Sequence, residues 1–499
     1  MSLLGIDVGS STTKAVAFRV DGTLLEQAHE AIPAVHPRPG WWEVDARDVL
    51  AATARVVRRV ATSEAVRRDP PTALAISASG REIVPVSAAG ASLGPCLRTA
   101  DLRAATRSAG GDREVSPQQW IDACGHVPDH RDPLNRLLWW REHHPDVFAQ
   151  THRFLGWHEL IALKLCGRAV TDPGSAGKWF GYDLATGRWS GRVLDAWQID
   201  ERLLPEIEAW GSLIGVVEPA VAADLSLPLG IAVGVGGFDT SCAALGSGAC
   251  SPGTVGLVVG SWESFVAPVD ARPTATPIID GGLAVGPHPG GSGLAVFALS
   301  PNGTIAVDRI RELTGLSLGD LETGLATSDS GPSPVLAIPH LSGATNPWSN
   351  GDRSQGAILG MSLATSKIDI ARAFMEGIAV DLALTIGQLR RVGMPTTAVR
   401  ASGGGSRSAW WMQLKADLSG VPFEVVDQPE AGALGAAILA GFADGSFPSL
   451  QHAVDSAVHL AHRYEPNTQR AELFRARTEA YCRAVESLVS LSKPAPEST

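Results

Sequence analysis

The chain has 499 residues, enough for two to four domains and for more than one hydrophobic core. It carries 41 lysine and arginine residues against 52 aspartate and glutamate residues, a formal net charge of −11. This balance argues against nucleic acid or an anionic membrane as the main partner, because both bind basic faces. With 44% hydrophobic and 19% charged residues, the composition is that of an ordinary globular protein and excludes a disordered chain.

The cysteines and the hydropathy of the chain indicate the cellular compartment of the protein. The six cysteines are scattered without CxxC or metal-ligand spacing, so we expect them to be reduced and mostly buried. The chain reaches Asp7 after a very short apolar stretch, which does not fit a signal peptide, and no run of about 18 apolar residues occurs. We therefore expect a cytoplasmic protein without a membrane partner.

The chain is predicted to open with an antiparallel β-meander. Residues 3–8 are typical of a short strand, residues 9–13 of a polar turn and residues 14–19 of a second strand. Asp21-Gly22 then indicates a tight hairpin before a third strand. Further elements of the first half are two helices and a strand, expected at residues 46–60, 134–143 and 73–77.

A weak internal repeat begins a second half of similar length. Residues 5–10 and residues 256–261 are identical at four of six positions, and both end in Gly-Ser. The second copy lies within residues 254–266, which again have the pattern of a hairpin. The sequence therefore predicts two related α/β domains, each opening with a hairpin whose first turn is Gly-Ser.

The second half contains the helix with the clearest signals. Ser366 and Asp369 form a predicted capping box, apolar residues recur every three or four positions up to Leu389, and Gly393 ends the helix. Other elements expected here are a strand at 398–401, a glycine-rich turn at 402–406, a helix to about residue 418 and a helix at 431–441.

Asp7 and the turn Gly9-Ser10-Ser11-Thr12 are the first candidate for chemistry. A carboxylate at a strand end beside a turn of small residues can hold hydrated Mg²⁺, while backbone N–H groups and hydroxyls face phosphates. Lys14 can add a positive charge. A plain hairpin turn with Asp7 as its cap is an open alternative. The chain has no GxxxxGK[ST] or GxGxxG pattern, which excludes a P-loop NTPase and a dinucleotide-binding turn.

Asp239 is the second candidate. It follows a predicted strand at residues 231–235 and the pair Gly236-Gly237, which lets another group approach closely. A carboxylate at this point can accept a hydroxyl proton while the oxygen attacks phosphorus. A simple N-cap on the helix expected at residues 240–246 is the alternative, and both roles are compatible.

Two weaker candidates also follow strand ends, and two further patterns match known motifs without the structural context that those motifs require. The glycine cluster at residues 402–406 offers bare backbone to a flat ligand, with a plain loop as the alternative. Gly80-Arg81-Glu82 lies at the carboxyl end of a strand, where α/β sheets bind ligands, with a surface ion pair as the alternative. Ser92 matches GxSxG but lacks the strand and helix of a hydrolase elbow. His126 and His130 are separated by a proline, which favours a loop over a metal site.

In their order and spacing these elements resemble the FGGY family of carbohydrate kinases, members of the actin–hexokinase superfold. The likeness covers roughly residues 3 to 460. One of the segments that carry it has Arg136 where the family usually has Lys. The segments are, in chain order, residues 5–14, Gly40-Trp41-Trp42-Glu43-Val44-Asp45, residues 133–142, residues 356–361 with 369–376, residues 402–417 and residues 430–437.

The resemblance implies an α/β protein of two domains with the actin–hexokinase-like (ribonuclease H-like) fold and its active site in the interdomain cleft. The N-terminal domain (residues 1–248) would bind the sugar and carry the catalytic base, and the C-terminal domain (residues 249–490) would bind the nucleotide. The implied reaction is ATP-dependent phosphorylation of a hydroxyl of a small sugar or polyol, as in xylulokinases. ATP and Mg²⁺ are the implied cofactors, and a homodimer is the suggested assembly.

The same resemblance assigns roles to individual residues. Asp239 would be the general base that takes the proton from the acceptor hydroxyl, and Asp7 would organise Mg²⁺. The acceptor would lie between Asp239 and five further side chains, namely Arg81, Glu82, Asp101, Arg103 and Trp157. ATP would contact two turns of small residues, a lysine and the glycine cluster, namely Ser10, Ser11, Thr12, Thr13, Lys14, Gly260, Ser261, Gly403, Gly404, Gly405 and Ser406.

Departures from the family pattern fall on the acceptor side. Ser79-Gly80-Arg81 stands where many sugar kinases have Ser-Gly-Gln, and Arg81-Glu82 is similar to a stretch of glycerol kinases. The segment Asp101-Leu102-Arg103 lacks the aromatic residue that usually precedes it, and Ala344-Thr345 replaces a frequent Glu-Arg. The acceptor is therefore open between glycerol and a pentulose such as xylulose. An actin-like ATPase and a non-catalytic sugar-binding or sensor protein on the same fold are the alternative functions.

Overall fold

The computed structural model of the chain describes residues 1–105, 116–274, 278, 282–290, 293–328, 331–344 and 354–491, which form two compact units. The chain passes from unit 1 to unit 2 after Cys250, close to the predicted boundary at residue 248, and later returns to unit 1 twice. Unit 1 consists of Met1–Cys250, Val285–Ala295 and Glu430–His459, and unit 2 of Ser251–Ala284, Val296–Pro429 and Leu460–Thr499.

Unit 1 is built on a six-stranded mixed sheet. Its strands are, in sheet order, β13 (Leu213–Val216), β14 (Ala232–Phe238), β5 (Pro71–Ala78), β1 (Ser2–Val8), β2 (Thr12–Arg19) and β3 (Leu24–Ala31). Antiparallel pairing of β1 with β2 and of β2 with β3 confirms the predicted N-terminal meander. The strand β5 lies between β1 and β14 and runs parallel to both, so the carboxyl ends of these three strands meet at one edge.

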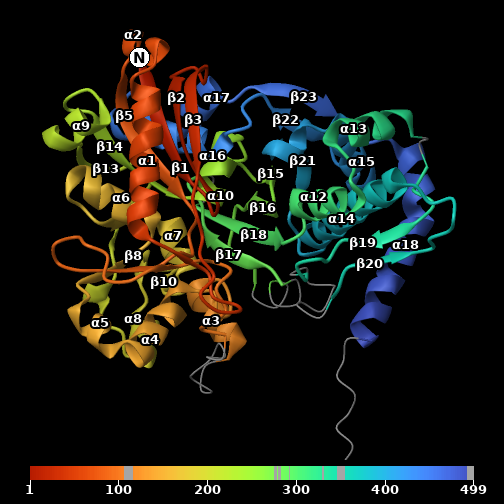
Figure 1. Cartoon of the computed structure of the whole chain (residues 1–499), viewed down its shortest axis with the longest axis horizontal. Helices are drawn as coiled ribbons and strands as arrows, with labels where there is room; N and C mark the ends of the chain where they lie inside the picture. The colour runs from red at the N-terminus through yellow and green to blue at the C-terminus, as the bar shows by residue number, and fades with distance from the viewer. Residues whose placement is uncertain are drawn as a thin grey trace, which may run out of the picture. The chain divides into compact units, whose positions relative to one another are not determined.

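Helices cover both faces of this sheet (Figure 1). Because side chains alternate along a strand, Leu4 and Ile6 of β1 belong to the same apolar cluster as the buried residues of α1 (Ala46–Ala61). Leu3 belongs instead to the cluster formed with α10 (Asp239–Gly246) and α16 (Ala431–Ala443). A Cβ atom on Gly5 would lie 1.9 Å from the carbonyl oxygen of Ala433, so only glycine allows α16 to pack this closely.

A second, aromatic-rich layer of unit 1 carries the loops that follow the sheet. Its core contains Trp120, Trp139, Trp179 and Phe180. Its helices are α3 (Pro117–Cys124), α4 (Pro133–His143), α5 (Pro145–Gln150), α7 (Pro173–Lys178) and α8 (Gly191–Trp197), whereas α6 (Trp157–Cys166) packs in the apolar core of the sheet. The remaining elements of unit 1 before Cys250 are β4 (Glu43–Val44), α2 (Glu64–Arg68), β6 (Val84–Val86), β7 (Cys96–Leu97), β8 (Arg153–Leu155), β9 (Val170–Thr171), β10 (Tyr182–Asp183), β11 (Arg188–Trp189), η1 (Glu201–Leu203), β12 (Glu206–Ile207) and α9 (Pro219–Leu225). The strand β17 (Ala284–Pro287) and the helix α17 (Leu450–Ala457) lie in the segments that return to unit 1 later in the chain.

Unit 2 repeats the strand topology of unit 1. Its strands belong to a seven-stranded sheet with the order β17, β18 (Leu294–Ser300), β16 (Glu263–Pro268), β15 (Gly253–Val259), β21 (Thr396–Ser402), β22 (Phe423–Val426) and β23 (Leu460–Tyr464), in which the edge strand β17 has no counterpart in the first sheet. As with β1, the central strand β15 pairs antiparallel with the next strand in the chain and parallel with β21. The outer pairs β21–β22 and β22–β23 are parallel and antiparallel, like β5–β14 and β14–β13. This shared order supports the predicted duplication.

The long helix α14 (Lys367–Arg391) has the predicted ends. Ser366 Oγ accepts a hydrogen bond from the Asp369 N–H at 3.1 Å, and Asp369 Oδ2 accepts one from the Ser366 N–H at 2.9 Å, so the capping box is confirmed. The helix ends at Arg391, before Gly393, whose φ is +83°. The other elements of unit 2 are α12 (Thr304–Thr314), α13 (Leu318–Thr327), β19 (Leu336–Ile338), β20 (Ala357–Leu359), η4 (Gly404–Arg407), α15 (Ala409–Ser419) and α18 (Thr468–Leu491).

The structure also bears on several smaller predictions. The six cysteines are free thiols. The Ser92 hydroxyl donates to the Gly94 carbonyl at 2.6 Å, and the next element is the short strand β7, so the hydrolase elbow has no structural basis. His126 and His130 lie in the loop between α3 and α4, as expected. Thr345 of the Ala344-Thr345 departure falls outside the described residues.

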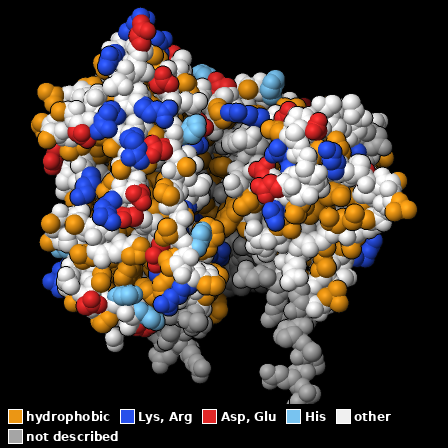
Figure 2. All heavy atoms as spheres, in the orientation of Figure 1, with side chains coloured by type: hydrophobic (Ala, Val, Ile, Leu, Met, Phe, Trp, Pro, Cys, Tyr) orange, Lys and Arg blue, Asp and Glu red, His pale blue; other side chains and the backbone are white. Residues whose placement is uncertain are grey.

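Two features of the whole chain bear on its partners. Among the described residues, no helix has the length and hydropathy required to cross a bilayer. Figure 2 shows basic and acidic side chains interspersed over the face in view. The absence of nucleic-acid and membrane partners stays a prediction from the net charge of −11.

Candidate active site

Asp7 lies near the carboxyl end of the central strand β1. Its neighbours across the sheet are Lys14 on β2 and Ser77 on β5. Asp7 Oδ1 accepts a hydrogen bond from Ser77 Oγ at 2.7 Å, so the carboxylate is tied to the neighbouring strand rather than acting as a cap for the turn. Burial raises the pKa of Asp7, and the positive charge of Lys14 opposes this rise. A half-buried carboxylate of this kind gains from a nearby cation.

The turn after β1 exposes small hydroxyl residues. The Gly9 N–H donates to the Thr12 carbonyl at 3.0 Å and closes the turn, which leaves Ser10 and Ser11 exposed. Thr13 is fully buried, and its hydroxyl pairs with that of Thr53 on α1 at 3.2 Å. The position of Thr13 therefore gives no support to its predicted contact with ATP.

Lys14 forms a long-range ion pair that sequence reasoning missed. Its Nζ lies 2.6 Å from Glu430 Oε2, at the start of α16. The negative charge of Glu430 raises the pKa of Lys14 against the opposing effect of burial. The pair links the meander of unit 1 to the segment that returns to it at Glu430, and Lys14 lies opposite Asp7 in the sheet.

Asp239 is placed by two glycines that no other residue could replace without a shift of the backbone. A Cβ atom on Gly236 would lie 2.0 Å from the Ile76 carbonyl oxygen. Gly237 has φ +150°, and a Cβ atom there would lie 2.4 Å from Asp172 Cγ. Asp239 is the first residue of α10 while Phe238 occupies the N-cap position, so the alternative that Asp239 is the N-cap is wrong.

The environment of Asp239 raises its pKa into the neutral range. Burial, followed by the negative charges of Asp7 and Glu82, raises the pKa of Asp239 to about 7. Two hydrogen bonds oppose this rise, because Asp239 Oδ1 accepts from the Thr240 N–H at 2.6 Å and from the Thr240 hydroxyl at 3.1 Å. A carboxylate with a pKa near 7 is suited to general base catalysis at neutral pH.

The loop after β5 brings Arg81 and Glu82 to the same sheet edge. Gly80 packs on the Phe238 ring, where a Cβ atom would lie 2.6 Å from Cδ2. Glu82 is fully buried, and its carboxylate accepts from the Thr99 hydroxyl at 3.1 Å and from the Arg81 N–H at 3.2 Å. The Arg81 side chain is partly exposed. This is not the surface ion pair between Arg81 and Glu82 that was weighed as the alternative.

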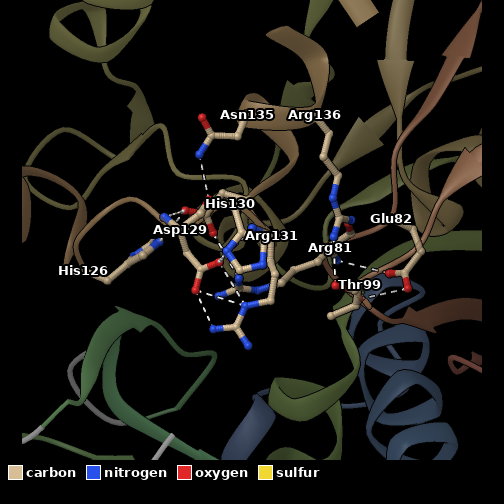
Figure 3. A network of polar contacts seen from close by, with 10 residues as sticks. Arg81, Glu82, Thr99, His126, Asp129, His130, Arg131, Asn135 and Arg136 are labelled. Carbon is tan, nitrogen blue, oxygen red and sulfur yellow. Dashed lines mark hydrogen bonds and ion pairs between the residues drawn. The ribbon is translucent and has the colours of Figure 1, made fainter. Parts of the chain in front are cut away.

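Arg136 fixes this loop from behind. Its guanidinium donates to the carbonyl oxygens of Arg81 at 2.5 Å, of Leu97 at 3.3 Å and of Thr99 at 2.9 Å. Figure 3 shows its side chain reaching from α4 to Arg81 and Thr99. Full burial lowers the pKa of Arg136 to about 10, so it stays charged. A planar guanidinium can satisfy three carbonyls at once, which an ammonium group does less well.

Asp101 and Arg103 are engaged with each other. The Arg103 backbone and side chain donate to Asp101 at 2.8–2.9 Å, and the guanidinium also reaches Glu43 Oε1 at 2.8 Å. Arg103 stacks on the Trp41 ring at 3.9 Å, and the Trp42 N–H donates to Asp101 at 2.7 Å. These contacts explain the Gly-Trp-Trp-Glu stretch structurally. A direct contact of Asp101 or Arg103 with the acceptor stays a prediction.

Trp157 opens α6 and is buried in the apolar core of unit 1, with 2% of its surface exposed. Its contact with the acceptor also stays a prediction.

Two charged residues that the sequence analysis did not single out lie near Arg81. Asp132 Oδ1 lies 3.2 Å from Arg81 Nη1, and Lys178 lies over the Phe238 ring at 5.1 Å. Asp132 precedes Pro133, a pattern typical of a helix N-cap, so its local signal indicated capping rather than a site.

In unit 2, the turn between β15 and β16 is bonded to the start of α12. The Gly260 carbonyl accepts from the Thr304 N–H at 2.9 Å, and the Ser261 carbonyl accepts from the Gly303 N–H at 3.0 Å. A Cβ atom on Gly303 would lie 2.4 Å from the Gly260 carbonyl oxygen, so the two segments are in direct contact. The Gly260-Ser261 turn is therefore rigidly held at the end of the central strand.

The glycine cluster lies against the end of the same strand. Gly403 has φ +88°, and a Cβ atom there would lie 2.9 Å from the Val259 carbonyl oxygen. Gly404 is exposed, with no atom within 4 Å of a Cβ position, so its backbone is accessible. The Ser406 hydroxyl donates to the Gly403 carbonyl at 2.7 Å and closes the turn. Gly260 and Ser261 thus share one strand end with the Gly403–Ser406 turn in unit 2.

A pocket of about 300 Å³ adjoins this cluster at the carboxyl ends of β21 and β22. It is lined by Ser406 and Arg407 after β21 and by Val426 and Asp427 at the end of β22, among others. Ligands of α/β sheets bind at this edge.

Comparisons with known proteins agree with these features. Residues 2–246 match the model of the N-terminal domain of the FGGY family of carbohydrate kinases, and residues 304–443 match the model of its C-terminal domain. The chain therefore belongs to the FGGY family of carbohydrate kinases. It is an enzyme, a phosphotransferase with an alcohol group as acceptor, and the expectation from its motifs is confirmed.

Individual relatives extend over nearly the whole chain. A xylulose kinase of Staphylococcus epidermidis is 25% identical over 517 residues, covering 98% of this chain and 97% of its own. A glycerol kinase of Bordetella parapertussis is 28% identical over 514 residues, covering 99% and 98%. The crystal structure of a xylulose kinase from Rhodospirillum rubrum superposes with a TM-score of 0.86 at 22% identity, covering 99% and 100%. The two-domain fold predicted from the sequence is thus confirmed.

Proposed function

We propose that this kinase transfers the γ-phosphoryl group of ATP to a hydroxyl of a small sugar or polyol, with Asp239 as the general base. The position of Asp239 carries the proposal. It follows two obligatory glycines at the edge where β1, β5 and β14 end, and its pKa is raised to about 7. The similarity to xylulose and glycerol kinases supports this class of acceptor.

The proposed role of Asp239 is to accept the proton of the attacking hydroxyl. The Thr240 N–H and hydroxyl both donate to Oδ1, so they orient the carboxylate and leave Oδ2 for the acceptor. A positioned base of this kind contributes roughly 10²–10⁴-fold to the rate. Arg81 and Glu82, on the neighbouring loop, are proposed to contact other hydroxyls of the acceptor.

The nucleotide is proposed to contact turns of both units. In unit 1 these are Ser10, Ser11 and Thr12 with the Lys14 ammonium beside them, and in unit 2 the Gly260-Ser261 turn and the Gly403–Ser406 turn. Phosphoryl transfer requires mainly alignment and neutralisation of charge, which backbone N–H groups, hydroxyls and one ammonium supply. The exposed backbone of Gly404 supports a contact with a flat part of the nucleotide.

The residues around Asp7 fit a Mg²⁺ ion. Asp7 is a half-buried carboxylate with a raised pKa, and the negative charge of Asp7 in turn raises the pKa of Asp239, so a cation would relieve both. Asp7 is proposed to hold this ion through water, as hydrated Mg²⁺ prefers. When bound, the ion would neutralise charge on the phosphate oxygens.

A coupled assay of ADP release tests the proposed function. ATP with glycerol, D-xylulose, xylitol or ribitol should give ADP in proportion to the acceptor consumed, and Asp239→Asn should lose at least 10²-fold of this rate while it still binds ATP. ADP release that no acceptor stimulates would contradict the proposal. Near-normal turnover by Asp239→Asn would contradict the assignment of the base.

A further inference from the structure

Arg81 has a buried counter-charge that the family resemblance did not indicate. Asp132 Oδ1 lies 3.2 Å from Arg81 Nη1, and the Asp132 side chain is fully buried whereas 23% of the Arg81 side chain is exposed. The aspartate therefore lies behind the arginine, away from solvent. Asp132 acts on any ligand of this loop through Arg81.

The Asp132 carboxylate is committed to this interaction. The residue occupies the N-cap position of α4, yet its side chain makes no hydrogen bond to the helix. Its Oδ2 instead accepts from the Asp129 N–H at 2.7 Å and lies 3.7 Å from His126 Nε2, while Oδ1 is the oxygen beside Arg81. Because a buried carboxylate without a counter-charge is strongly unfavourable, the pair is held as a unit.

The carboxylates next to Arg81 and Asp132 have partners of their own. Asp129 is neutralised by Arg131, whose backbone and side chain donate to it at 2.5–3.0 Å, and Glu82 is bonded to Thr99 and to the Arg81 N–H. Figure 3 shows Asp129 with Arg131 on one side of the network and Glu82 with Thr99 on the other. Two cations and two carboxylates lie near Phe238, namely Arg81, Lys178, Asp132 and Asp239, and the negative charge of Glu82 also acts on Asp239.

The electrostatic effects on Lys178 show that these four groups are close enough to interact. Burial and the positive charge of Arg81 lower the pKa of Lys178 to about 7, while the charges of Asp132 and Asp239 oppose this shift. Lys178 also lies over the ring of Phe238, the residue that precedes Asp239. A ligand here meets hydrogen-bonding groups without a net positive field.

We propose that Asp132, by neutralising Arg81 from behind, makes this enzyme select uncharged polyols or ketoses and reject aldonates as acceptors. The inference rests on the proposed function and deepens it by naming the charge class of the acceptor. A hydroxyl can accept a hydrogen bond from the exposed side of Arg81 and needs no counter-charge. The carboxylate of an aldonate would need an uncompensated cation, and it would approach Asp132 and Asp239, which carry like charge.

Matched pairs of ligands separate charge from shape. Glycerol and glycerate, xylitol and xylonate, and glucitol and gluconate differ only in whether a CH₂OH or a carboxylate ends the chain. Binding of each member to the full-length protein is measured by calorimetry without ATP, and kcat/KM is measured with ATP. We expect at least one uncharged member, or D-xylulose, to bind, and each aldonate to be at least about tenfold weaker than its partner.

Asp132→Asn is the decisive variant, because the amide oxygen can still accept from the Asp129 N–H while the charge is lost. The preference for the uncharged member should fall by about tenfold or more. Asp132→Glu, which keeps the charge, and Asp146→Asn, at an exposed residue of α5, should keep the preference. Melting temperatures report whether each variant is folded.

Each outcome either supports or overturns the proposed selection of uncharged acceptors. A wild-type protein that binds gluconate or xylonate as well as the matching alditol overturns the inference, and so does failure of every uncharged ligand to bind. An unchanged preference in folded Asp132→Asn overturns the role of Asp132. If uncharged ligands bind selectively but never stimulate ADP release, the inference stands and the proposed kinase reaction fails instead.

Discussion

The environment of Asp239 makes opposite predictions for activity and for stability. Asp239→Asn replaces the carboxylate with a neutral group of the same shape whose oxygen can still accept from the Thr240 N–H. The variant should therefore lose the base while the fold gains stability at neutral pH. Ordinary misfolding would lower both, so the two effects together distinguish a catalytic group from a structural one.

The size of the stability gain follows from the pKa. A carboxyl group with an ordinary pKa of 3.8 that is raised to about 7 in the folded state disfavours folding once it ionises. The full difference corresponds to about 4 kcal/mol at pH well above 7. Because Asp239 is partly exposed, we expect about half of this, ~2 kcal/mol, which corresponds to a rise in melting temperature of roughly 4–8 °C for a unit of this size.

The sign of the pH dependence is a further check. The unfolded chain ionises at lower pH than the folded chain, so the folded state binds more protons between pH 3.8 and about 7. The wild-type protein should lose stability through this window, and the advantage of Asp239→Asn should grow from about pH 4 to pH 7 and then level off. In the active wild type, kcat/KM should rise with pH through about 7 as the base ionises.

The assay is thermal unfolding of both proteins between pH 4 and pH 8.5, followed by ADP release under the same conditions. Asp195→Asn, at an exposed carboxylate of α8, is the matched control and should change neither property. An Asp239→Asn protein whose stability equals that of wild type at every pH would refute the raised pKa of this carboxylate. One with lower stability throughout would refute it as well.

Three further substitutions test contacts that hold the acceptor loop, Asp239 and the core of unit 2 in place. Arg136→Lys should raise the KM of the acceptor by about tenfold while the KM of ATP is unchanged, because the shorter reach and tetrahedral donors of an ammonium group fit the carbonyls of Arg81, Leu97 and Thr99 less well than a planar guanidinium does; equal changes in both values would contradict this. Gly237→Ala should reduce kcat by about 10²-fold in a folded protein, since its Cβ would collide with Asp172 and displace Asp239, and normal kcat would be evidence against the strained turn. Lys415→Met should destabilise unit 2 by about 3–5 kcal/mol in urea unfolding, because it leaves Glu263 buried without its partner at 2.6 Å, and the added substitution Glu263→Leu should restore most of the loss.

Local sequence patterns were sufficient to predict the parts of the fold that are determined by residues close together in the chain. The Asp21-Gly22 hairpin and the Ser366 capping box are set by residues within a few positions, and both are present. The location of Asp7 and Asp239 at strand ends was likewise predictable, because a strand followed by glycines or small residues marks the end of a strand in α/β proteins.

Contacts between distant segments had no such signal. Lys14 and Glu430 are 416 residues apart, and nothing near either residue indicates its partner. Asp132 was hidden because Asp-Pro has a common local explanation as a helix start. Thr13 looked like its neighbours in the turn, but the alternation of the strand points it toward α1, where it is buried.

The late return of the chain to unit 1 has a consequence for synthesis on the ribosome. The face of the sheet that carries Leu3 and Gly5 is covered by α16, which ends at Ala443. Until that helix emerges, a nascent chain of more than 400 residues leaves part of this apolar surface bare, and such surfaces are the ones that chaperones bind. Truncation before residue 430 should therefore yield aggregates rather than an isolated acceptor-side domain, and attempts to express that domain alone should append the segment Glu430–His459 by a linker.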